Sequence, residues 1–155
     1  MRLLHVTHQY SPAIGGAEKY ITDLSEELAR RGHDIDVYTS RSVDYRTWKN
    51  TLPRFERVHG VNVRRFDSLQ RTDCVWHILE LGFRHYWQSR RWWYELLIYL
   101  GNGPVSLAMF FALLRNVGSY DLMHISNIHY SHAFLAYLAA RFHRLPYIVT
   151  PHIHA

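Results

Sequence analysis

Two glycines close to the N-terminus are placed where a phosphate-binding loop is expected. Gly15 and Gly16 follow an apolar run that predicts a strand over residues 2–7, and a helical pattern begins directly after them. Glycine has no Cβ, so a ligand can approach the backbone, and the first N–H groups of a helix have no intrahelical partner. The spacing matches neither the dinucleotide fingerprint nor the P-loop, so an anion site and a plain tight turn both stay open.

Polar side chains follow four of the predicted strands. In chain order these residues are His8, Ser40 with Arg41, Ser126 to His129, and His152 with His154. The carboxyl ends of parallel strands lie at one edge of a sheet, where open α/β proteins bind their ligands. We therefore expect a cleft lined by imidazoles, hydroxyls and the glycine loop, with His129 among its substrate-binding residues.

The twelve histidines of the chain raise the question of a metal site. His129 and His132 are three residues apart, and His152 and His154 form a His-x-His pair, whereas zinc requires three or four ligands in tetrahedral order. The chain contains no His-Glu-x-x-His motif and few acidic residues near these histidines, so we assign no metal site. A metal-dependent hydrolase built on the histidines is the corresponding alternative.

Hydrophobic periodicity predicts an α/β domain. The first forty residues form a β-α-β unit, with a strand at 2–7, a helix at 16–31 capped by Gly32, and a parallel strand at 35–39. Residues 55–58 and 61–66 are short strands that form either a hairpin or a bend leading into a third strand. The remaining elements are a helix at 75–100, a helix at 104–116 with Pro104 in its first position, a strand at 121–126, a largely apolar helix at 130–142 and a strand at 146–150.

Residues 84–94 combine tryptophans and tyrosines with Arg84, Arg90 and Arg91. This composition is typical of a half-buried helix whose arginines face water, and also of a helix lying on an anionic membrane surface. Stacking on single-stranded nucleic acid is a third reading, but no OB or RRM pattern accompanies it, so we expect no nucleic-acid partner.

Composition places the chain among ordinary globular domains. Its 155 residues are enough for one domain, and its net charge is +5, with the basic excess in residues 41–95. Cys74 is the only cysteine, and the N-terminus lacks the pattern of a signal peptide. We expect a cytoplasmic protein, with attachment at the inner face of the membrane through residues 84–94.

Several segments resemble the N-terminal part of a family 4 glycosyltransferase with the GT-B architecture. They begin at Tyr10 (Tyr-Ser-Pro-Ala-Ile-Gly-Gly-Ala-Glu), Leu28 (Leu-Ala-Arg-Arg-Gly-His-Asp-Ile-Asp-Val), Tyr120 (Tyr-Asp-Leu-Met-His-Ile) and Leu145 (Leu-Pro-Tyr-Ile-Val-Thr-Pro-His). The likeness runs from residue 2 to residue 152 and is poor over 67–100. It implies a Rossmann-like three-layer α/β/α domain with a mainly parallel sheet.

The resemblance also implies an activity, that of a retaining transferase using a nucleotide-sugar donor, with no cofactor and no required metal ion. By this likeness Gly15 and Gly16 approach the phosphates of the donor or the acceptor. Glu18 helps to order the loop and is counted with the substrate-binding residues, and His152 lies near the transferred sugar as the catalytic candidate. Many such enzymes act on lipid-linked or cell-envelope acceptors.

Residues 1–155 correspond to a single acceptor-side domain, and the second, nucleotide-sugar domain with its Glu-x7-Glu motif is absent from this sequence. We therefore expect the chain alone to be inactive, and to self-associate through the interface that it exposes. The alternative function is a non-catalytic Rossmann-like module that binds a phosphorylated or lipid ligand.

Overall fold

A six-stranded sheet forms the centre of the molecule, with the spatial order β3-β4-β2-β1-β5-β6. The computed structural model describes residues 1–71, 77, 81, 84–85, 92 and 103–152. Its strands are β1 (Arg2–Val6), β2 (Asp34–Ser40), β3 (Phe55–Val58), β4 (Val61–Phe66), β5 (Leu122–Ser126) and β6 (Tyr147–Thr150). Its helices are α1 (Gly16–Arg30), α4 (Leu107–Asn116) and α5 (Ser131–His143), and a 3₁₀ turn, η1, spans Val117–Ser119. All strand pairs are parallel except β3 with β4.

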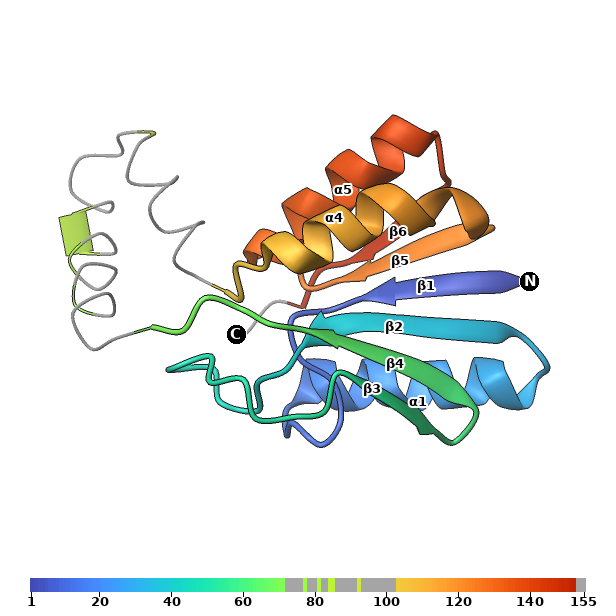
Figure 1. Ribbon diagram of the computed structural model, residues 1–155, viewed down its shortest axis with the longest axis horizontal. Coiled ribbons are helices and arrows are strands. Elements are labelled where there is room, and N and C mark those ends of the chain that lie inside the picture. Colours follow the sequence, from blue (N-terminus) through green and yellow to red (C-terminus); the bar gives the residue numbers. More distant parts are fainter. Residues whose placement is uncertain (72–76, 78–80, 82–83, 86–91, 93–102, 153–155) are drawn as a thin grey trace.

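Helices cover both faces of the sheet (Figure 1). Helix α1 packs on one face, and α4 and α5 lie side by side on the other. Successive side chains of β1 point to opposite faces of the sheet. Leu3 packs in the same hydrophobic cluster as Ile21 of α1, and Leu4 in the cluster on the other face, with Met109 of α4. The expected three-layer α/β/α architecture with a mainly parallel sheet is confirmed.

The predicted β-α-β unit is confirmed over the first forty residues. Helix α1 starts at Gly16 and ends at Arg30, and β1 and β2 pair in parallel with Arg2 opposite Asp34. Gly32 has a φ of 87° and donates its N–H to the carbonyl of Ala29 at 2.9 Å. The glycine therefore ends the helix in the left-handed conformation that the sequence led us to expect.

Of the two alternatives for residues 55–66, the hairpin is correct. Strands β3 and β4 are antiparallel, and the turn residues His59 and Gly60 have φ values of 47° and 86°. A two-residue type I′ turn requires positive φ at both positions. Strand β4 also pairs in parallel with β2, so the hairpin adds both a third parallel strand and an antiparallel edge strand to the sheet.

The expectation that Pro104 opens the next helix is wrong. Helix α4 starts at Leu107, and Ser106 caps it by accepting the N–H of Met109 at 3.2 Å. The same hydroxyl donates to the carbonyl of Asp67 at 2.6 Å, which ties the start of α4 to the end of β4. The side-chain oxygen of a serine can accept an N–H of the first helical turn, which proline cannot do. The N-cap is therefore Ser106, and the first helical residue is Leu107. The helix expected over 75–100 lies outside the described residues.

Replacing Ser106 tests this cap. Ser106→Ala removes the acceptor for Met109 and leaves the partly buried Asp67 carbonyl without its donor, so we expect a loss of about 1 to 2 kcal/mol in the free energy of unfolding. Urea denaturation measures the change. Ser106→Thr keeps both hydrogen bonds and serves as the control; an alanine variant as stable as the original protein would contradict the assignment.

Candidate functional site

The glycine loop ends at the start of α1, and no side chain caps that helix. A Cβ added to Gly15 would lie 2.0 Å from Oε2 of Glu18, whereas one added to Gly16 would meet no atom within 4 Å. A side chain at position 15 would therefore have to displace the carboxylate packed against it. Gly16 is exposed, so its backbone is open to a ligand at the positive end of the helix.

Glu18 is a buried carboxylate paired with an imidazole. Its Oε1 lies 2.8 Å from Nε2 of His8, and the two side chains are 10% and 3% exposed. The hydrogen bond from His8 lowers the pKa of Glu18 against the opposing effect of burial, and the charges of His8 and His152 lower it further. Glu18 is thus ionised at neutral pH, and it links the end of β1 to the first turn of α1.

The structure places His152 beside the first turns of α1. His152 follows β6 by two residues and packs edge-on against Tyr20 at 5.3 Å between ring centroids. The charge of His152 also lowers the pKa of Glu18, which agrees with a position of this imidazole near the start of α1. Its Nε2 is buried and has no hydrogen-bond partner among the described residues. Residues from the two ends of the sequence therefore meet around Glu18.

Three rings, those of Tyr130, Trp48 and His132, pack around the imidazole of His8. Tyr130 stacks on His8 at 4.1 Å, and Trp48 and His132 have their ring centroids 6.3 Å and 5.9 Å from it. His132 is fully buried and donates from Nε2 to the carbonyl of Ser126 at 2.8 Å. Burial lowers the pKa of His132 to about 3, so its ring is neutral. The cluster holds the imidazole of His8 in one orientation.

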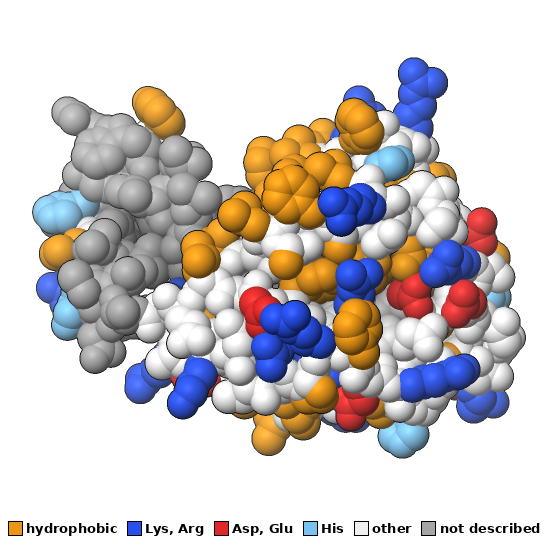
Figure 2. All heavy atoms as spheres, in the orientation of Figure 1, with side chains coloured by type: hydrophobic (Ala, Val, Ile, Leu, Met, Phe, Trp, Pro, Cys, Tyr) orange, Lys and Arg blue, Asp and Glu red, His pale blue; other side chains and the backbone are white. Residues whose placement is uncertain are grey.

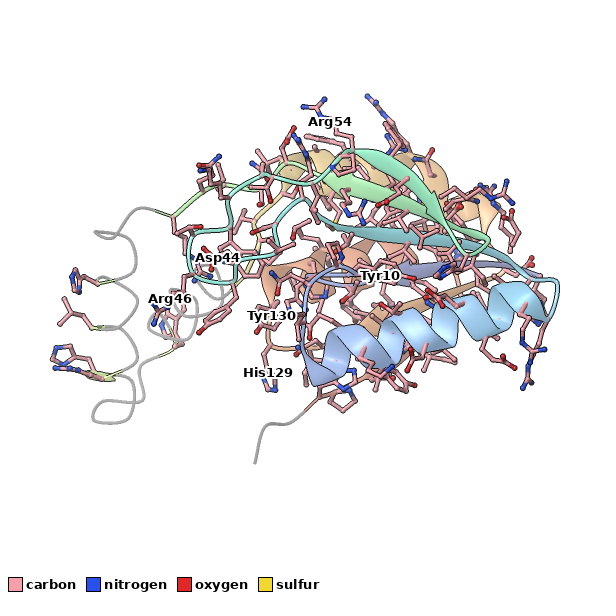
Figure 3. The ribbon with its side chains drawn as sticks, turned by 90° about the horizontal axis from the view of Figure 1, so that it is seen from below. Tyr10, Asp44, Arg46, Arg54, His129 and Tyr130 are labelled. Carbon is pink, nitrogen blue, oxygen red and sulfur yellow. The ribbon has the colours of Figure 1, made fainter. Side chains whose placement is uncertain are left out.

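Sequence reasoning did not single out Trp48 or Tyr130. The available signals were a lone tryptophan within the otherwise polar segment 40–54 and a tyrosine at the first position of the predicted helix of residues 130–142. His129, which was singled out, is exposed. Figure 3 shows it next to Tyr130, at the end of the molecule where α1 starts.

The polar residues that follow β2 fix neighbouring loops. Ser40 donates its hydroxyl to the carbonyl of His8 at 2.7 Å. Arg41 pairs with Asp67 at 2.5 Å and donates to the carbonyl of Leu52 at 2.6 Å. These side chains are engaged in holding the carboxyl edge together, so the exposed backbone of Gly16 and the unpaired Nε2 of His152 are the groups at this edge that can meet a ligand.

Over the described ranges, no three His, Cys, Asp or Glu side chains gather as a metal ion would require. His132 is tied to a backbone carbonyl, and His154 lies outside the described residues. In the same part of the chain, no helix is both long and apolar enough to cross a bilayer.

A hollow of about 660 Å³ opens on the opposite edge of the sheet, where β1 begins. The carboxylate of Asp36 lies in it and accepts hydrogen bonds from Arg2 at 3.1 Å, Asn62 at 2.9 Å and Tyr120 at 2.5 Å. Because these groups satisfy one another, the hollow presents a matched polar set. At the glycine loop, by contrast, the N-cap residue Gly15 has no side chain to offer the first N–H groups of the helix.

The sheet order and the loop at its carboxyl edge define a Rossmann-like α/β domain. Among solved structures, sucrose-phosphate synthase from Thermosynechococcus elongatus, a GT-B glycosyltransferase, superimposes on 98% of this chain with a TM-score of 0.50 at 14% sequence identity. The match covers 33% of that enzyme. The fold is thus the Rossmann-like α/β fold found in GT-B glycosyltransferases.

Residues 15–155 match the family described as the glycosyl transferase 4-like domain, and the chain belongs to this family. An uncharacterized glycosyltransferase of Methanocaldococcus jannaschii is 41% identical over 66 residues, which is 42% of this chain and 15% of that protein. The GDP-mannose:cellobiosyl-diphosphopolyprenol alpha-mannosyltransferase of Komagataeibacter xylinus is 27% identical over 138 residues, 88% of this chain and 26% of that enzyme. The chain therefore spans about a quarter or less of these relatives.

The two glycines form a matched pair for mutation. Gly15→Ala forces the Glu18 carboxylate away from its place beside His8, so we expect a loss of about 1 to 3 kcal/mol, the usual range for a buried charge-assisted hydrogen bond. Gly16→Ala meets open space and should be nearly neutral. Thermal and urea unfolding measure both. In a Glu18→Ala background, Gly15→Ala should lower the free energy of unfolding by less than it does alone. If the effects of the two substitutions simply add, the contact between Gly15 and Glu18 would be refuted.

The neutral, buried His132 predicts a pH dependence of stability. Its pKa is about 3 in the folded protein, against about 6.5 when exposed. The unfolded chain binds the proton first, so the free energy of unfolding falls as pH drops through this window, by about 1.4 kcal/mol per pH unit. His132→Gln keeps a donor for the carbonyl of Ser126 but has no group that titrates in this range. The free energy of unfolding of this variant should therefore fall less steeply with decreasing pH, by the same amount of about 1.4 kcal/mol per unit. Equal slopes in urea titrations would count against a neutral His132.

Proposed function

We propose that this chain is the N-terminal, acceptor-side domain of a retaining glycosyltransferase, which moves a sugar from a nucleotide-sugar donor to an acceptor. The observation that carries the proposal is the meeting of the Gly15–Gly16 loop with His152 around Glu18. Membership of the glycosyl transferase 4-like family supports the same conclusion. In this proposal the nucleotide-sugar is a substrate, and neither a cofactor nor a metal ion takes part.

The start of α1 is suited to the phosphates of such a substrate. The backbone N–H groups of Gly16 and Ala17 lie in its first turn, where the helix dipole favours negative charge. When the glycosidic bond to the nucleotide breaks, charge develops on the departing diphosphate, and fixed N–H donors lower the energy of that state. Glu18 carries a charge of the same sign, and its pairing with His8 reduces the repulsion that a diphosphate would meet.

His152 is the proposed contact to the transferred sugar. Its Nε2 is buried without a partner among the described residues, so a substrate hydroxyl can satisfy it. Gly15 and Gly16 provide the close approach to backbone. His129 is exposed at the same edge, where it is available to the acceptor.

A second domain of the whole protein would close over the carboxyl edge and bind the sugar and the nucleotide. Without it the donor is not held in place, and positioning accounts for much of the rate of such reactions. We therefore propose that this chain alone is inactive, and that its exposed edge favours self-association. The whole enzyme would work in the cytoplasm, on a lipid-linked or cell-envelope acceptor.

The decisive assay follows transfer of a radiolabelled sugar. Labelled GDP-mannose, UDP-glucose and similar donors are offered with a saccharide linked to polyprenyl diphosphate. We expect no transfer by this chain alone, and transfer once it is part of the two-domain enzyme. In that enzyme His152→Ala should lower kcat by about 10² to 10³-fold, the usual cost of one stabilising group in an active site.

His59→Ala is the matched control, because His59 lies in the β3–β4 turn and pairs with Glu26 far from the site. Turnover by the isolated chain would refute its inactivity, and unchanged kcat in His152→Ala would refute the role of the imidazole. A second candidate function is a non-catalytic module that binds a phosphorylated ligand. It is favoured because the whole anion-binding start of α1 lies within this chain. Binding of the phosphorylated ligand without transfer by the two-domain protein would establish it.

A further inference from the structure

Two rows of side chains cross strands β2, β4 and β3 on the side of the sheet that carries α4. Residues two apart on a strand point to the same side, and the register of the strands sets their neighbours. The rows consist of Tyr38, Arg64 and Phe55 and, nearer the amino edge, of Asp36, Asn62 and Arg57. All six side chains line the hollow of about 660 Å³. Figure 2 looks onto this side of the molecule, where basic, acidic and apolar side chains gather below α4.

Arg64 lies in the middle of the first row, where aromatic rings hold its guanidinium group. The guanidinium carbon is 5.1 Å from the ring centroid of Phe66, 5.4 Å from that of Phe55 and 5.7 Å from that of Tyr38. The faces of the rings attract the cation, whereas its N–H donors lie in the plane of the group and remain able to donate hydrogen bonds. Arg64 is half-buried, so these donors are held in the hollow in a defined orientation.

Arg57 brings a second guanidinium group to the same hollow. Arg64 is the cross-strand partner of Phe55, and Arg57 is two residues further along β3, so the two arginines are diagonal neighbours in the sheet. Such neighbours are about 7 to 8 Å apart, which long side chains can bridge. Both guanidinium groups can therefore contact one small ligand. We call Arg57 and Arg64 the arginine pair.

The other charged groups of the hollow are already neutralised. Arg2 lies 3.1 Å from the carboxylate of Asp36, and Glu56 lies 2.6 Å from the buried Arg65. In the described part of the chain, neither member of the arginine pair forms an ion pair with a carboxylate. Two like charges on neighbouring strands repel each other unless an anion lies between them. The hollow therefore has a positive charge that a ligand can neutralise.

We propose that the arginine pair binds a small phosphorylated molecule, at a second anion site separate from the glycine loop. A phosphate group carries a charge of about −2 and three acceptor oxygens, so it can engage two guanidinium groups at once, whereas a carboxylate has one charge and two oxygens. Phe55 is 68% exposed beside Arg64 and offers an apolar surface to the organic part of the ligand. The hollow lies where β1 begins, and the glycine loop follows the end of β1, so the inference is independent of the proposed function.

Titration of the ¹⁵N-labelled chain with inorganic pyrophosphate, followed by nuclear magnetic resonance, tests the proposal. The backbone amides of Arg57, Asn62 and Arg64 should shift together with one dissociation constant, and binding should weaken as salt is added. Malonate, a dicarboxylate of similar size, should bind more weakly than pyrophosphate. Because pyrophosphate also suits the start of α1, the amides of Gly16 and Ala17 report on that site separately.

Substitutions in the arginine pair should act on the hollow alone. Arg57→Gln replaces an exposed side chain and should raise the dissociation constant measured at Asn62 by about tenfold or more, the usual effect of losing a charge-assisted hydrogen bond, with the shifts of Gly16 unchanged. Arg64→Lys keeps the charge but loses the planar donors, so it should also weaken binding.

Arg141→Gln is the matched control, because Arg141 is an exposed arginine of α5 that lies outside the hollow. It removes the same charge and should leave binding at the arginine pair unchanged. Equal weakening by Arg141→Gln and Arg57→Gln would overturn the proposal, as would tighter binding of malonate than of pyrophosphate. Shifts confined to the glycine loop would also overturn it, while leaving the proposed function intact.

Discussion

The hydrogen bond between Glu18 and His8 is the interaction on which the candidate site depends. A buried carboxylate is costly unless it is paired and hydrogen-bonded, and here one oxygen lies 2.8 Å from His8 while the other lies against Gly15. That single side chain fixes the end of β1, the first turn of α1 and the loop between them. It also explains why residue 15 lacks a side chain, since any Cβ would displace the carboxylate.

Two histidines, His5 within β1 and His8 just after it, pair with polar residues on the buried side of α1. Ser25 donates its hydroxyl to the carbonyl of Ile21 at 2.6 Å, so Nδ1 of His5, 2.8 Å away, must be the donor to Ser25. Burial lowers the pKa of His5 to about 3, so this imidazole is neutral. The inner pair is purely structural, whereas the pair formed by Glu18 and His8 stands at the edge where a ligand can reach the loop.

Several of the buried polar atoms that have no hydrogen-bond partner lie near this same edge. Within the described residues they include Nδ1 of His8, Nε1 of Trp48, Oγ of Ser126, Oδ1 of Asn127, Nδ1 of His132 and Nε2 of His152. Buried groups of this kind are normally satisfied by protein groups or by ordered water. Stability is lower there than a fully paired arrangement would give.

Periodicity and strand ends were enough to predict the β-α-β unit and the edge at which His152 lies, whereas the three layers were implied by the likeness to family 4 glycosyltransferases. The pattern of apolar residues failed for α1, where Tyr20 is 44% exposed and Glu18 and Ser25 are buried, because their partners lie on another element. It also could not tell the alanine face of α5 from its phenylalanine face. The cap at Ser106 and the ring cluster around Tyr130 depend on contacts between segments far apart in the sequence, which local patterns do not contain.

Nuclear magnetic resonance of the ¹⁵N-labelled chain during titration with GDP examines most directly whether the paired glycines and His152 form one anion site around Glu18. The backbone amides of Gly16 and Ala17 and the ring of His152 should shift together, with one shared dissociation constant. Shifts confined to Arg2, Asn62 and Tyr120 would move the ligand to the opposite edge of the sheet, and shifts at the glycines without His152 would separate the two halves of the site.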